Sequence, residues 1–381
     1  MSKKILIISG EHSGDFYGAA LARDLRKFDH TLLITGIGSC LMREAGVEIL
    51  YDSSQWSAVG LLEASVKIPG LLWVFDRLKR YILKHKIDLI VLIDFPSFNM
   101  RLARFAKKHN IPSVYYFPPS AWTEKTDRAI EVSSTVNRVI ATFSYTADIY
   151  KKAGKEAVFY GHPVMGKLRP SMKREEAFKF FGLSPDKLCV SIFPGSRNHE
   201  ITRMLPVFIE GARIIRKELP ELQFALSCVS EYMEEKITYY LKKCNFDAKI
   251  ITGYSYDLMN ISHFIIATSG TVTLEAAYFN VPMVIGYKIS SLSWFIALRT
   301  LHLPPYAGLP NLIARKEIVP EFIQNNLSPR AIAEKSLEIL SDTEKMKHMK
   351  EELSKAIQTL GSPDAGDMIA KEIYSMVKGK E

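Results

Sequence analysis

Short apolar runs alternate along the chain with longer stretches in which apolar residues recur at helical spacing. In the first half of the chain, the apolar runs span residues 5–9, 31–35, 89–93, 113–117 and 138–141. Uninterrupted Val, Ile and Leu are typical of parallel strands whose two faces are both covered by helices. This pattern predicts an α/β fold built on a parallel sheet.

The same alternation resumes after a polar interruption. Near Gly161-His162-Pro163 the apolar rhythm breaks and a stretch rich in charges and proline follows, so we place the domain linker there. Further apolar runs span residues 189–193, 223–229, 249–252, 264–267 and 283–287. We therefore predict two doubly wound α/β domains, 1–163 and 164–345, that face a central cleft. The helices of 346–381 are expected to pack back across the domains.

Length and composition agree with a folded protein of more than one domain. The chain has 381 residues, of which 47% are hydrophobic and 24% are charged, as in ordinary globular domains. Its four cysteines form no C-x-x-C pair, so neither a structural zinc site nor a disulfide framework is predicted. No stretch of ~18 apolar residues occurs, so no membrane-spanning helix is expected.

Lys and Arg outnumber Asp and Glu by 50 to 41, which gives a formal net charge of +9. This excess favours anionic partners: nucleic acid, phosphorylated substrates or an anionic membrane surface. Nucleic acid is disfavoured because no basic motif is interleaved with aromatic residues. Residues 66–86 mix Trp73, Phe75 and leucines with Lys and Arg. They predict either an interfacial helix or an ordinary helix packed on the sheet. Residues 293–303 are a second candidate.

Polar residues and glycines follow the first predicted strand. The segment Ser9-Gly10-Glu11-His12-Ser13-Gly14-Asp15 ends this strand and leads into a helix. Glycine lets a ligand approach the backbone closely, and a helix N-terminus offers free N–H groups to an anion. The alternative is a tight turn without a ligand. Glu11 could face the cleft or cap the helix.

Asp94 follows the most apolar of the predicted strands. In a doubly wound sheet the carboxyl end of such a strand faces the ligand crevice. Asp94 could therefore act as a general base that deprotonates an acceptor hydroxyl. Its alternative role is to cap the helix that begins near Ser97.

Two turns in the second half have the character of a nucleotide site. Gly195 and Ser196 follow a strand and precede Arg197. Backbone amides and a guanidinium can bind a diphosphate without a metal ion. After a later strand come small hydroxyl residues and, four positions after Thr271, Glu275. A carboxylate one helical turn into that helix can accept hydrogen bonds from both ribose hydroxyls. Each turn alone is compatible with ordinary capping, but together they favour nucleotide binding.

Seven motifs follow one another along the chain: Gly10-Glu11-x-Ser13-Gly14-Asp15, Ile93-Asp94-x-Pro96-x-Phe98-Asn99, Pro118-x-Ser120-x-Trp122, Gly161-His162, Pro194-Gly195-Ser196-Arg197, Ser269-Gly270-Thr271-x-x-Leu274-Glu275 and Leu309-Pro310-Asn311-Leu312. In this order and approximate spacing, and over nearly its whole length, the chain resembles the lipid-A-disaccharide synthases. The resemblance implies a GT-B glycosyltransferase of two Rossmann-like domains. It implies an inverting transfer, without metal or cofactor, from UDP-2,3-diacylglucosamine to 2,3-diacylglucosamine 1-phosphate.

The resemblance also implies roles for individual residues. Asp94 is implied as the base, Glu11 as a residue near the acceptor or the base, and Arg197 as a diphosphate contact. The implied UDP-sugar positions are Gly195, Ser196, Arg197, Met204, Ser269, Gly270, Thr271, Glu275, Asn311 and Gln324. The implied acceptor positions are Gly10, Glu11, Ser13, Gly14, Asp15, Asn99, Ser120 and Trp122. The chain departs from the family pattern on the acceptor side, at Ser97, Met165-Gly166 and Thr123-Glu124-Lys125.

The implied partners are the two acylated sugars and an anionic inner-membrane surface, and a homodimer is a further expectation. The implied location is the cytoplasm, at the inner face of the inner membrane of a Gram-negative-type bacterium. Two alternatives stay open. One is a UDP-N-acetylglucosamine enzyme of the same fold with a different acceptor. The other is a nucleotide-sugar or lipid-binding relative without turnover.

Overall fold

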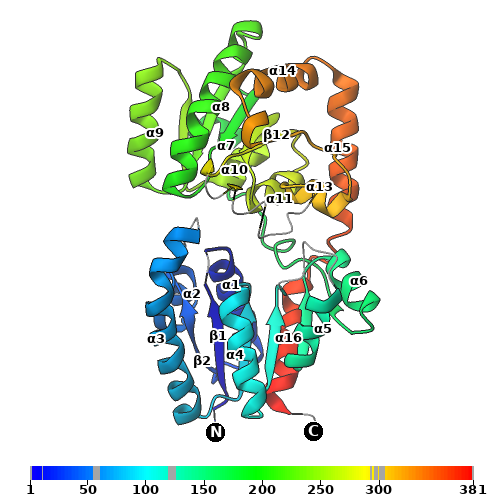
Figure 1. Cartoon of the computed structure of the whole chain (residues 1–381). Helices are drawn as coiled ribbons and strands as arrows, with labels where there is room; N and C mark the ends of the chain where they lie inside the picture. The colour runs from blue at the N-terminus through cyan, green and yellow to red at the C-terminus, as the bar shows by residue number, and fades with distance from the viewer. Residues whose placement is uncertain are drawn as a thin grey trace. The chain divides into compact units, whose positions relative to one another are not determined.

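The computed structural model describes residues 2–10, 12–54, 61–118, 126–291, 294–295, 299 and 305–379 (Figure 1). The chain forms two compact units, and each is described by itself. Unit 1 comprises Met1–Lys167, Phe295–Leu303 and Leu360–Glu381, and unit 2 comprises Leu168–Trp294 and Pro304–Thr359.

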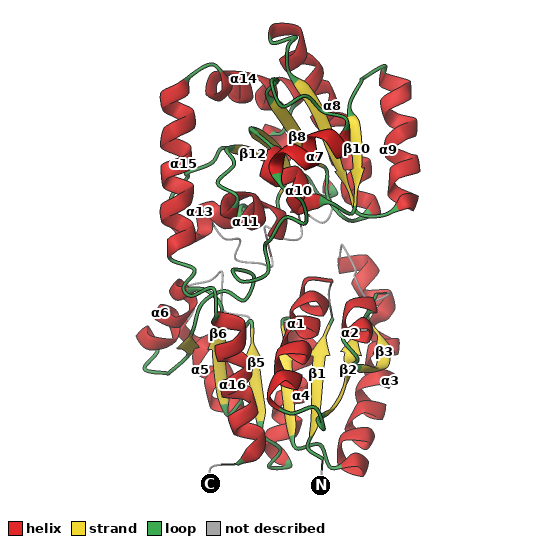
Figure 2. Cartoon of the chain, turned by 180° about the vertical axis from the view of Figure 1, so that it is seen from behind, coloured by secondary structure: helices red, strands yellow, loops and turns green. Residues whose placement is uncertain are grey.

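Unit 1 is built on a sheet of seven strands in the order β3-β2-β1-β4-β5-β6-β7, and all its strand pairs are parallel. The strands are β1 (Lys4–Ser9), β2 (Leu33–Gly38), β3 (Glu48–Asp52), β4 (Leu89–Ile93), β5 (Ser113–Tyr116), β6 (Arg138–Ala141) and β7 (Val158–Phe159). The helices are α1 (His12–Phe28), α2 (Cys40–Glu44), α3 (Leu61–His85), α4 (Pro96–Lys108), α5 (Thr126–Thr135), α6 (Ser144–Lys152) and α16 (Ala365–Lys378). Figure 2 shows the strands between these helices.

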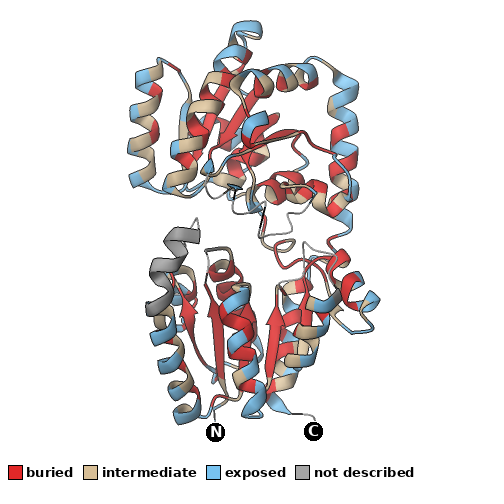
Figure 3. Cartoon of the chain, in the orientation of Figure 1, coloured by how far each residue is buried: buried red, intermediate tan, exposed pale blue. Residues whose placement is uncertain are grey.

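The alternation of side chains along β1 explains why helices cover both faces of this sheet. Ile5 belongs to the same buried cluster as Leu25 of α1 and Ile369 of α16. Its neighbour Leu6 belongs to the opposite cluster, with Leu78 of α3. Successive residues of a strand point to opposite faces, and burying each such side chain contributes about 1.5–3 kcal/mol. The predicted runs 5–9, 89–93, 113–117 and 138–141 correspond to strands that are largely buried on both sides (Figure 3). The run 31–35 overlaps only the first half of β2, where Leu33 is exposed.

Unit 2 contains a second parallel sheet, of six strands in the order β10-β9-β8-β11-β12-β13. The strands are β8 (Cys189–Phe193), β9 (Gln223–Cys228), β10 (Lys249–Thr252), β11 (Phe264–Thr268), β12 (Met283–Tyr287) and β13 (Glu321–Ile323). The helices are α7 (Arg174–Phe181), α8 (Asn198–Glu218), α9 (Glu231–Cys244), α10 (Ser255–Ile261), α11 (Thr271–Tyr278), α13 (Leu309–Ala314), α14 (Pro329–Leu340) and α15 (Thr343–Gln358). A short 3₁₀ helix, η1 (Gln324–Asn326), follows β13.

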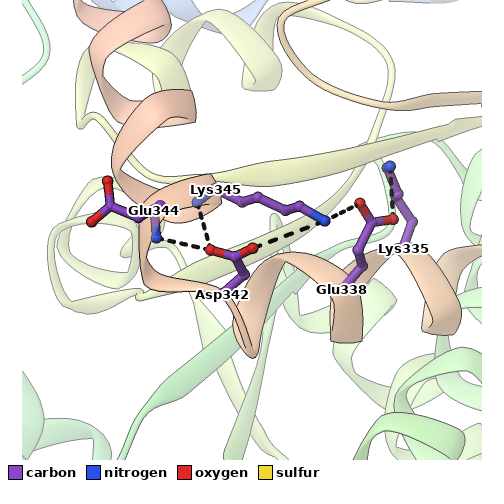
Figure 4. Close-up of polar contacts among 5 residues, drawn as sticks. All are labelled: Lys335, Glu338, Asp342, Glu344 and Lys345. Carbon is purple, nitrogen blue, oxygen red and sulfur yellow. Dashed lines mark hydrogen bonds and ion pairs between the residues drawn. The ribbon is translucent and has the colours of Figure 1, made fainter.

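A polar network joins α14 to α15 (Figure 4). The carboxylate of Asp342 caps α15 by accepting hydrogen bonds from the backbone N–H groups of Glu344 at 3.0 Å and Lys345 at 3.1 Å. The ammonium groups of Lys335 and Lys345 lie 2.8 and 2.7 Å from the carboxylate of Glu338. A groove of about 450 Å³ lies beside this network, and the two lysines that line it are already paired with Glu338.

The strand order of each sheet reverses at one point. This point lies between β1 and β4 in unit 1 and between β8 and β11 in unit 2. Ser9 pairs with Ile93 in the first sheet, and Phe193 pairs with Ala267 in the second, so the turns after these residues are neighbours. Ligands of doubly wound sheets bind outside the carboxyl ends of the strands at such a reversal. The predicted fold of two doubly wound α/β domains is confirmed.

Two segments of unit 1 that lie close in sequence to its boundaries with unit 2 are neighbours in the fold. Gly161 forms an antiparallel bridge with Gly361, and the backbone N–H of His162 donates to the carbonyl of Leu360 at 2.7 Å. The His162 ring is surrounded by the rings of Tyr17, Phe117 and Phe143. Burial lowers the pKa of His162 to about 3, so this histidine is a neutral, structural residue at neutral pH.

Helix α3 has two different faces. Val74, Leu78 and Ile82 recur every four residues and are buried against the sheet. Trp73 is 54% exposed and Leu72 is 49% exposed on the outer face. None of the described helices combines the length and the apolar composition needed to cross a membrane.

Candidate functional site

The turn after β4 places Asp94 at the carboxyl end of a central strand. Asp94 and Phe95 both have left-handed backbone conformations, with φ of 52° and 46°, and α4 begins at Pro96. Proline suits the first position of a helix because the N–H that it lacks would have no partner there. The N-cap position of α4 is Phe95 and not Asp94. The half-buried Asp94 is therefore at the predicted place and is not the helix cap.

Asn99 is completely buried beneath this turn. Its Nδ2 donates hydrogen bonds to the carbonyl oxygens of Ile93 at 3.1 Å and Asp94 at 2.8 Å. The family resemblance placed Asn99 on the acceptor side. In the structure its amide holds the backbone that carries Asp94, so any effect of Asn99 on the acceptor is exerted through that turn.

The glycine-rich turn after β1 packs closely against its neighbours. A Cβ atom at Gly10 would lie 2.4 Å from the ring of Phe95, and one at Gly14 would lie 2.4 Å from the Oγ of Ser9. A Cβ atom so close to a neighbour requires that neighbour to shift, which is harder for the packed ring of Phe95 than for the Ser9 hydroxyl. Contacts within the protein therefore favour glycine at both positions, and Gly10 brings the β1 turn against the Asp94 turn.

Asp15 is also completely buried, and its partners are backbone groups. Its carboxylate accepts hydrogen bonds from the N–H groups of Ser39 at 2.6 Å, Leu41 at 3.0 Å and Met42 at 3.4 Å. A carboxylate at the first turn of a helix satisfies free N–H groups and offsets their partial positive charge. Asp15 thus stabilises the connection between β2 and α2.

Some predicted acceptor residues lie outside the described residues. These are Glu11, Ser120 and Trp122, together with the departure at 123–125 and most of the candidate segment 293–303. Ser13 is described and lies half-buried in the first turn of α1.

The turn after β8 is occupied by a carboxylate of the chain itself. Gly195 has a φ of +111°, and a Cβ atom there would lie 2.5 Å from Oε2 of Glu200. The same Glu200 oxygen accepts hydrogen bonds from the backbone N–H groups of Ser196 at 2.9 Å and Arg197 at 3.1 Å. The predicted amide donors therefore exist, and Glu200 uses them in this structure. Glu200 lies three residues after the N-cap Arg197, which is the spacing of a capping box.

Arg197 and Met204 differ in accessibility. The Arg197 side chain is partly exposed, and its Nη1 lies 3.4 Å from the second oxygen of Glu200. Met204 is buried on α8 and contributes to the core of unit 2. Arg197 can therefore reach a ligand in the described conformation, whereas Met204 acts there as a packing residue.

The turn after β11 combines exposed and internally bonded hydroxyl groups. The Ser269 hydroxyl donates to the carbonyl of Ala307 at 2.6 Å. Gly270 and Thr271 are exposed at the start of α11. The Thr273 hydroxyl donates to the carbonyl of Gly270 at 2.8 Å. The exposed start of α11 is the part of this turn that a ligand can approach.

Glu275 lies half-buried one turn further along α11. Burial raises the pKa of its carboxyl from 4.5 to about 7, because a poorly solvated environment disfavours the charged form. Burial and the charge of Glu275 raise the pKa of Tyr256 above its ordinary value. Groups with strongly perturbed pKa values cluster at functional sites, so the raised pKa makes Glu275 a functional candidate at the predicted nucleotide position.

Asn311 uses its whole hydrogen-bonding capacity within the protein. Its Nδ2 donates to the carbonyl of Val319 at 2.7 Å and to the Glu321 carboxylate at 2.6 Å. Its Oδ1 accepts from the N–H groups of Ile318 at 2.7 Å and Val319 at 2.9 Å. A side-chain amide offers two donors and two acceptor sites. Asn311 therefore shapes the loop between α13 and β13, and it is completely buried.

Gln324 connects two loops at the same edge of the sheet. Its backbone is left-handed, with a φ of 53°, and its side chain is buried. In the amide orientation that satisfies both groups, Nε2 donates to the carbonyl of Ile289 at 3.3 Å and Oε1 accepts from the N–H of Ile289 at 3.1 Å. Gln324 therefore fixes the chain that follows β12.

Among the described predicted residues, Asp94 and the turn after β1 form a strand-end group at the reversal of unit 1, and the turns after β8 and β11 form a second group at the reversal of unit 2. Asn311 and Gln324 lie before and after β13, the edge strand of the second sheet, and Met204 lies in the core. Sequence reasoning did not single out Tyr115, Glu200 or Glu321, which support these groups. The capping-box spacing could have identified Glu200. Tyr115 and Glu321 lie on strands, and their partners become neighbours only in the folded chain. Over the described ranges, no group of three or more His, Cys, Asp and Glu side chains could hold a metal ion.

Comparisons with known proteins agree over nearly the whole chain. A family model described as lipid-A-disaccharide synthetase matches residues 5–371. The lipid-A-disaccharide synthase of Geobacter sulfurreducens is 37% identical over 380 residues, which cover 100% of this chain and 98% of that protein. The enzyme of the same name from Coxiella burnetii is 33% identical, with 99% of each chain covered.

Solved structures with low sequence identity share the fold. One is a UDP-GlcNAc 2-epimerase from Neisseria meningitidis bound to UDP-GlcNAc, with a TM-score of 0.66, 15% identity and coverage of 97% of this chain and 99% of that one. Another is a glycosyltransferase from Rickettsia africae, with a TM-score of 0.56, 13% identity and full coverage of both chains. Together with the full-length relatives and the two strand-end groups, these matches lead to one conclusion: the chain belongs to the lipid-A-disaccharide synthase family of glycosyltransferases.

Proposed function

We propose that this protein transfers 2,3-diacylglucosamine from UDP-2,3-diacylglucosamine to the 6-hydroxyl of 2,3-diacylglucosamine 1-phosphate. The products are the β-1,6-linked disaccharide 1-phosphate and UDP. The observation that carries this proposal is the family match over residues 5–371. The position of Asp94 and of the Gly195 and Glu275 turns at the reversal points supports it.

Unit 2 supplies the donor site in this proposal. The guanidinium of Arg197 contacts the diphosphate, and the exposed start of α11 at Gly270 and Thr271 offers backbone N–H groups to it. The Glu275 carboxylate accepts hydrogen bonds from the ribose hydroxyls. Fixed donors of this kind stabilise the negative charge that develops on the departing UDP. Asn311 and Gln324 hold the loops around this site.

Unit 1 supplies the base and the acceptor site. Asp94 removes the proton from the acceptor hydroxyl as its oxygen attacks the anomeric carbon from the face opposite UDP, which inverts that carbon. The sugar–phosphate bond breaks, and its electron pair leaves with UDP. Glu11, Ser13, Ser120 and Trp122 are proposed acceptor-side residues on the strength of the resemblance.

The test is an assay with the two purified acylated substrates that follows UDP release and disaccharide formation. Asp94→Asn should lower kcat by about 10²- to 10⁴-fold, the usual contribution of a positioned base, and leave UDP binding unchanged. Asp186→Asn is the matched control, because Asp186 is exposed in unit 2. The reaction is refuted if the wild-type protein releases no UDP with these substrates. Activity on an acceptor without acyl chains would favour the alternative enzyme of the same fold.

We also propose that α3 attaches the protein to the cytoplasmic face of an anionic inner membrane. The guanidinium of Arg77 lies 4.4 Å from the ring centroid of Trp73, and the ammonium of Lys79 lies 5.4 Å from that of Phe75. Phe75 also packs against the core, whereas the exposed Leu72 and Trp73 beside the Arg77 cation suit the boundary between acyl chains and anionic head groups. The face of α3 that carries Val74, Leu78 and Ile82 packs on the sheet, and membrane attachment is proposed for the opposite face alone.

Co-sedimentation with lipid vesicles tests this attachment. Wild-type protein should bind vesicles that contain phosphatidylglycerol and bind neutral phosphatidylcholine vesicles much less. Trp73→Ala should weaken binding to the anionic vesicles and preserve activity on detergent-dispersed substrates. Leu33→Ala is the control, since Leu33 is 51% exposed on β2 and not on α3. Equal loss in both variants would contradict the proposal.

A further inference from the structure

The backbone after β4 adopts a left-handed conformation that neighbouring groups must hold in place. Asp94 and Phe95 are consecutive non-glycine residues with φ of 52° and 46°. Residues other than glycine rarely enter the left-handed region, because their Cβ approaches the carbonyl oxygen. Two in succession persist only where the surrounding structure holds them, and such strain clusters at functional sites.

Two side-chain donors converge on one carbonyl oxygen of this turn. The Tyr115 hydroxyl donates to the carbonyl of Asp94 at 2.8 Å, and Nδ2 of Asn99 donates to the same oxygen at 2.8 Å. Nδ2 of Asn99 also donates to the carbonyl of Ile93 at 3.1 Å. The opposite amide orientation would place Oδ1 of Asn99 against two carbonyl oxygens, so only the donating orientation fits.

Both donors come from rigid elements. Tyr115 lies on β5, directly beside Leu92 of β4, and Asn99 lies in the first turn of α4. Both side chains are completely buried. Burial and the negative charge of Asp94 raise the pKa of Tyr115 well above its ordinary value. The hydroxyl is thus protonated, and able to donate, at neutral pH.

The other side of the turn is fixed by aromatic packing. The Phe95 ring lies against Gly10, where a Cβ atom would be 2.4 Å away. It also stacks on Phe98, with 5.2 Å between ring centroids and 19° between planes. Phe98 in turn meets Phe75 of α3 edge-on at 5.4 Å. The Asp94–Phe95 peptide is therefore held at its carbonyl oxygen and, one residue later, at an aromatic ring.

We propose that Tyr115 and Asn99 are positioning residues that hold the Asp94 carboxylate in its reactive orientation. They act through the peptide carbonyl of Asp94 and do not touch substrate. A shift of about 1 Å in a reacting group can cost about 10²-fold in rate, so a carbonyl anchor is an effective way to fix it. This inference rests on the proposed function, in which Asp94 is the base.

Tyr115→Phe is the cleanest test, because it removes the hydroxyl and keeps the ring that packs in the core. We expect kcat to fall about tenfold, as the second anchor, Asn99, stays in place. The KM for the UDP-sugar and the affinity for UDP should not change, because both depend on unit 2. Tyr116→Phe is the matched control: Tyr116 is the next residue of β5 and is buried in the cluster on the opposite face.

Combining Tyr115→Phe with Asp94→Asn separates positioning from a general structural role. If Tyr115 acts through the Asp94 carboxylate, its substitution should have no further effect on kcat once that carboxylate is absent. A structural defect would instead lower the rate by the same factor in both backgrounds, and that result would overturn the proposal. So would wild-type kcat in Tyr115→Phe.

Comparing the single variants distinguishes failure of the proposed function from failure of the positioning role. If Asp94→Asn alone leaves kcat unchanged, the base assignment of the proposed function fails, whatever Tyr115→Phe does. If Asp94→Asn lowers kcat but Tyr115→Phe does not, only the positioning role fails. Asn99→Ala should cause a larger loss of kcat than Tyr115→Phe, since it removes two hydrogen bonds. UDP binding by this variant reports whether unit 2 is still folded, and thermal unfolding reports whether the whole chain is.

Discussion

Glu200 bonds to both the backbone and the side chain of Arg197. One carboxylate oxygen accepts from the Arg197 N–H at 3.1 Å, and the other lies 3.4 Å from its guanidinium. The same carboxylate accepts from the N–H of Ser196. The Glu200 carboxylate thus occupies the backbone N–H donors of this turn. The Arg197 guanidinium is the donor group that extends beyond the turn.

Arg197→Ala should therefore weaken the use of the UDP-sugar. We expect kcat/KM to fall by about 10²-fold or more, because a fixed cationic donor to the leaving diphosphate is lost. Arg197→Lys should recover only part of the activity, since an ammonium group cannot make two parallel hydrogen bonds. Steady-state kinetics at varied UDP-sugar concentration measures the effect. Arg213→Ala, an exposed position on the same helix, should behave as wild type, and comparable losses in the two variants would contradict the assignment.

The pH dependence of UDP binding should report on Glu275. Its pKa is about 7 in the free protein, and only the ionised form accepts hydrogen bonds from both ribose hydroxyls. Binding stabilises the ionised form and so lowers the pKa of Glu275 from this raised value. Affinity for UDP should therefore rise as the pH increases from 6 to 8, and binding near pH 7 should release a proton.

Calorimetry in two buffers of different ionisation enthalpy detects that proton. In Glu275→Gln the proton release and the pH dependence between 6 and 8 should disappear, and the affinity at pH 8 should be lower than that of the wild type. Unchanged proton release in Glu275→Gln would assign the linkage to another group.

Asn311→Ala should reduce UDP affinity by destabilising unit 2. It leaves the buried N–H groups of Ile318 and Val319 and the Glu321 carboxylate without their amide partner. Each unsatisfied buried group costs about 1–3 kcal/mol. Thermal unfolding should therefore shift to lower temperature in step with the loss of affinity. Arg197→Ala provides the contrast, because it should lose activity without such a shift.

The network of Figure 4 allows a test of which polar contacts stabilise α15. Asp342→Ala removes an N-cap that satisfies two backbone N–H groups, and it should lower the unfolding free energy by about 1 kcal/mol. Lys345→Ala removes an exposed ion pair with Glu338, which should cost well under about 1 kcal/mol. Urea unfolding of both variants measures the difference. A larger loss in Lys345→Ala would mean that the ion pair, and not the cap, holds the junction.

Most of the fold was predictable because buried parallel strands are almost entirely apolar. The strands of unit 1 that the apolar pattern did not predict, β3 and β7, lie at the two edges of its sheet. β3 (Glu48–Asp52) carries a charge at each end and is at most half-buried, and β7 has two residues. Edge strands are short and polar on their open side, so their composition does not separate them from loops. β2 ends at Gly38 and not at residue 35, because Gly36, which looks like a strand breaker, is accommodated beside the backbone of Ile7.

The candidate site was predictable in position but not in detail. Strand ends and glycine turns located Asp94, Arg197 and Glu275 at the reversal points. The directions in which Asp15, Asn99 and Asn311 point were not predictable. A buried polar side chain must find partners, and these partners are backbone groups that the fold brings near from distant parts of the sequence. Tyr115 was missed for the same reason, since its hydroxyl meets Asp94 only once β4 and β5 pair.

The last helix has a consequence for how the chain folds as it is synthesised. α16 completes one face of unit 1, where Ile369 and Ile373 are buried in the same cluster as Ile5 of the first strand. All residues of unit 2, by contrast, precede Leu360. Domains fold as units while the chain emerges from the ribosome, N-terminus first. Unit 2 therefore has its full set of residues before unit 1 does. The unit whose strands are synthesised first must therefore wait until α16 has been synthesised to close its core.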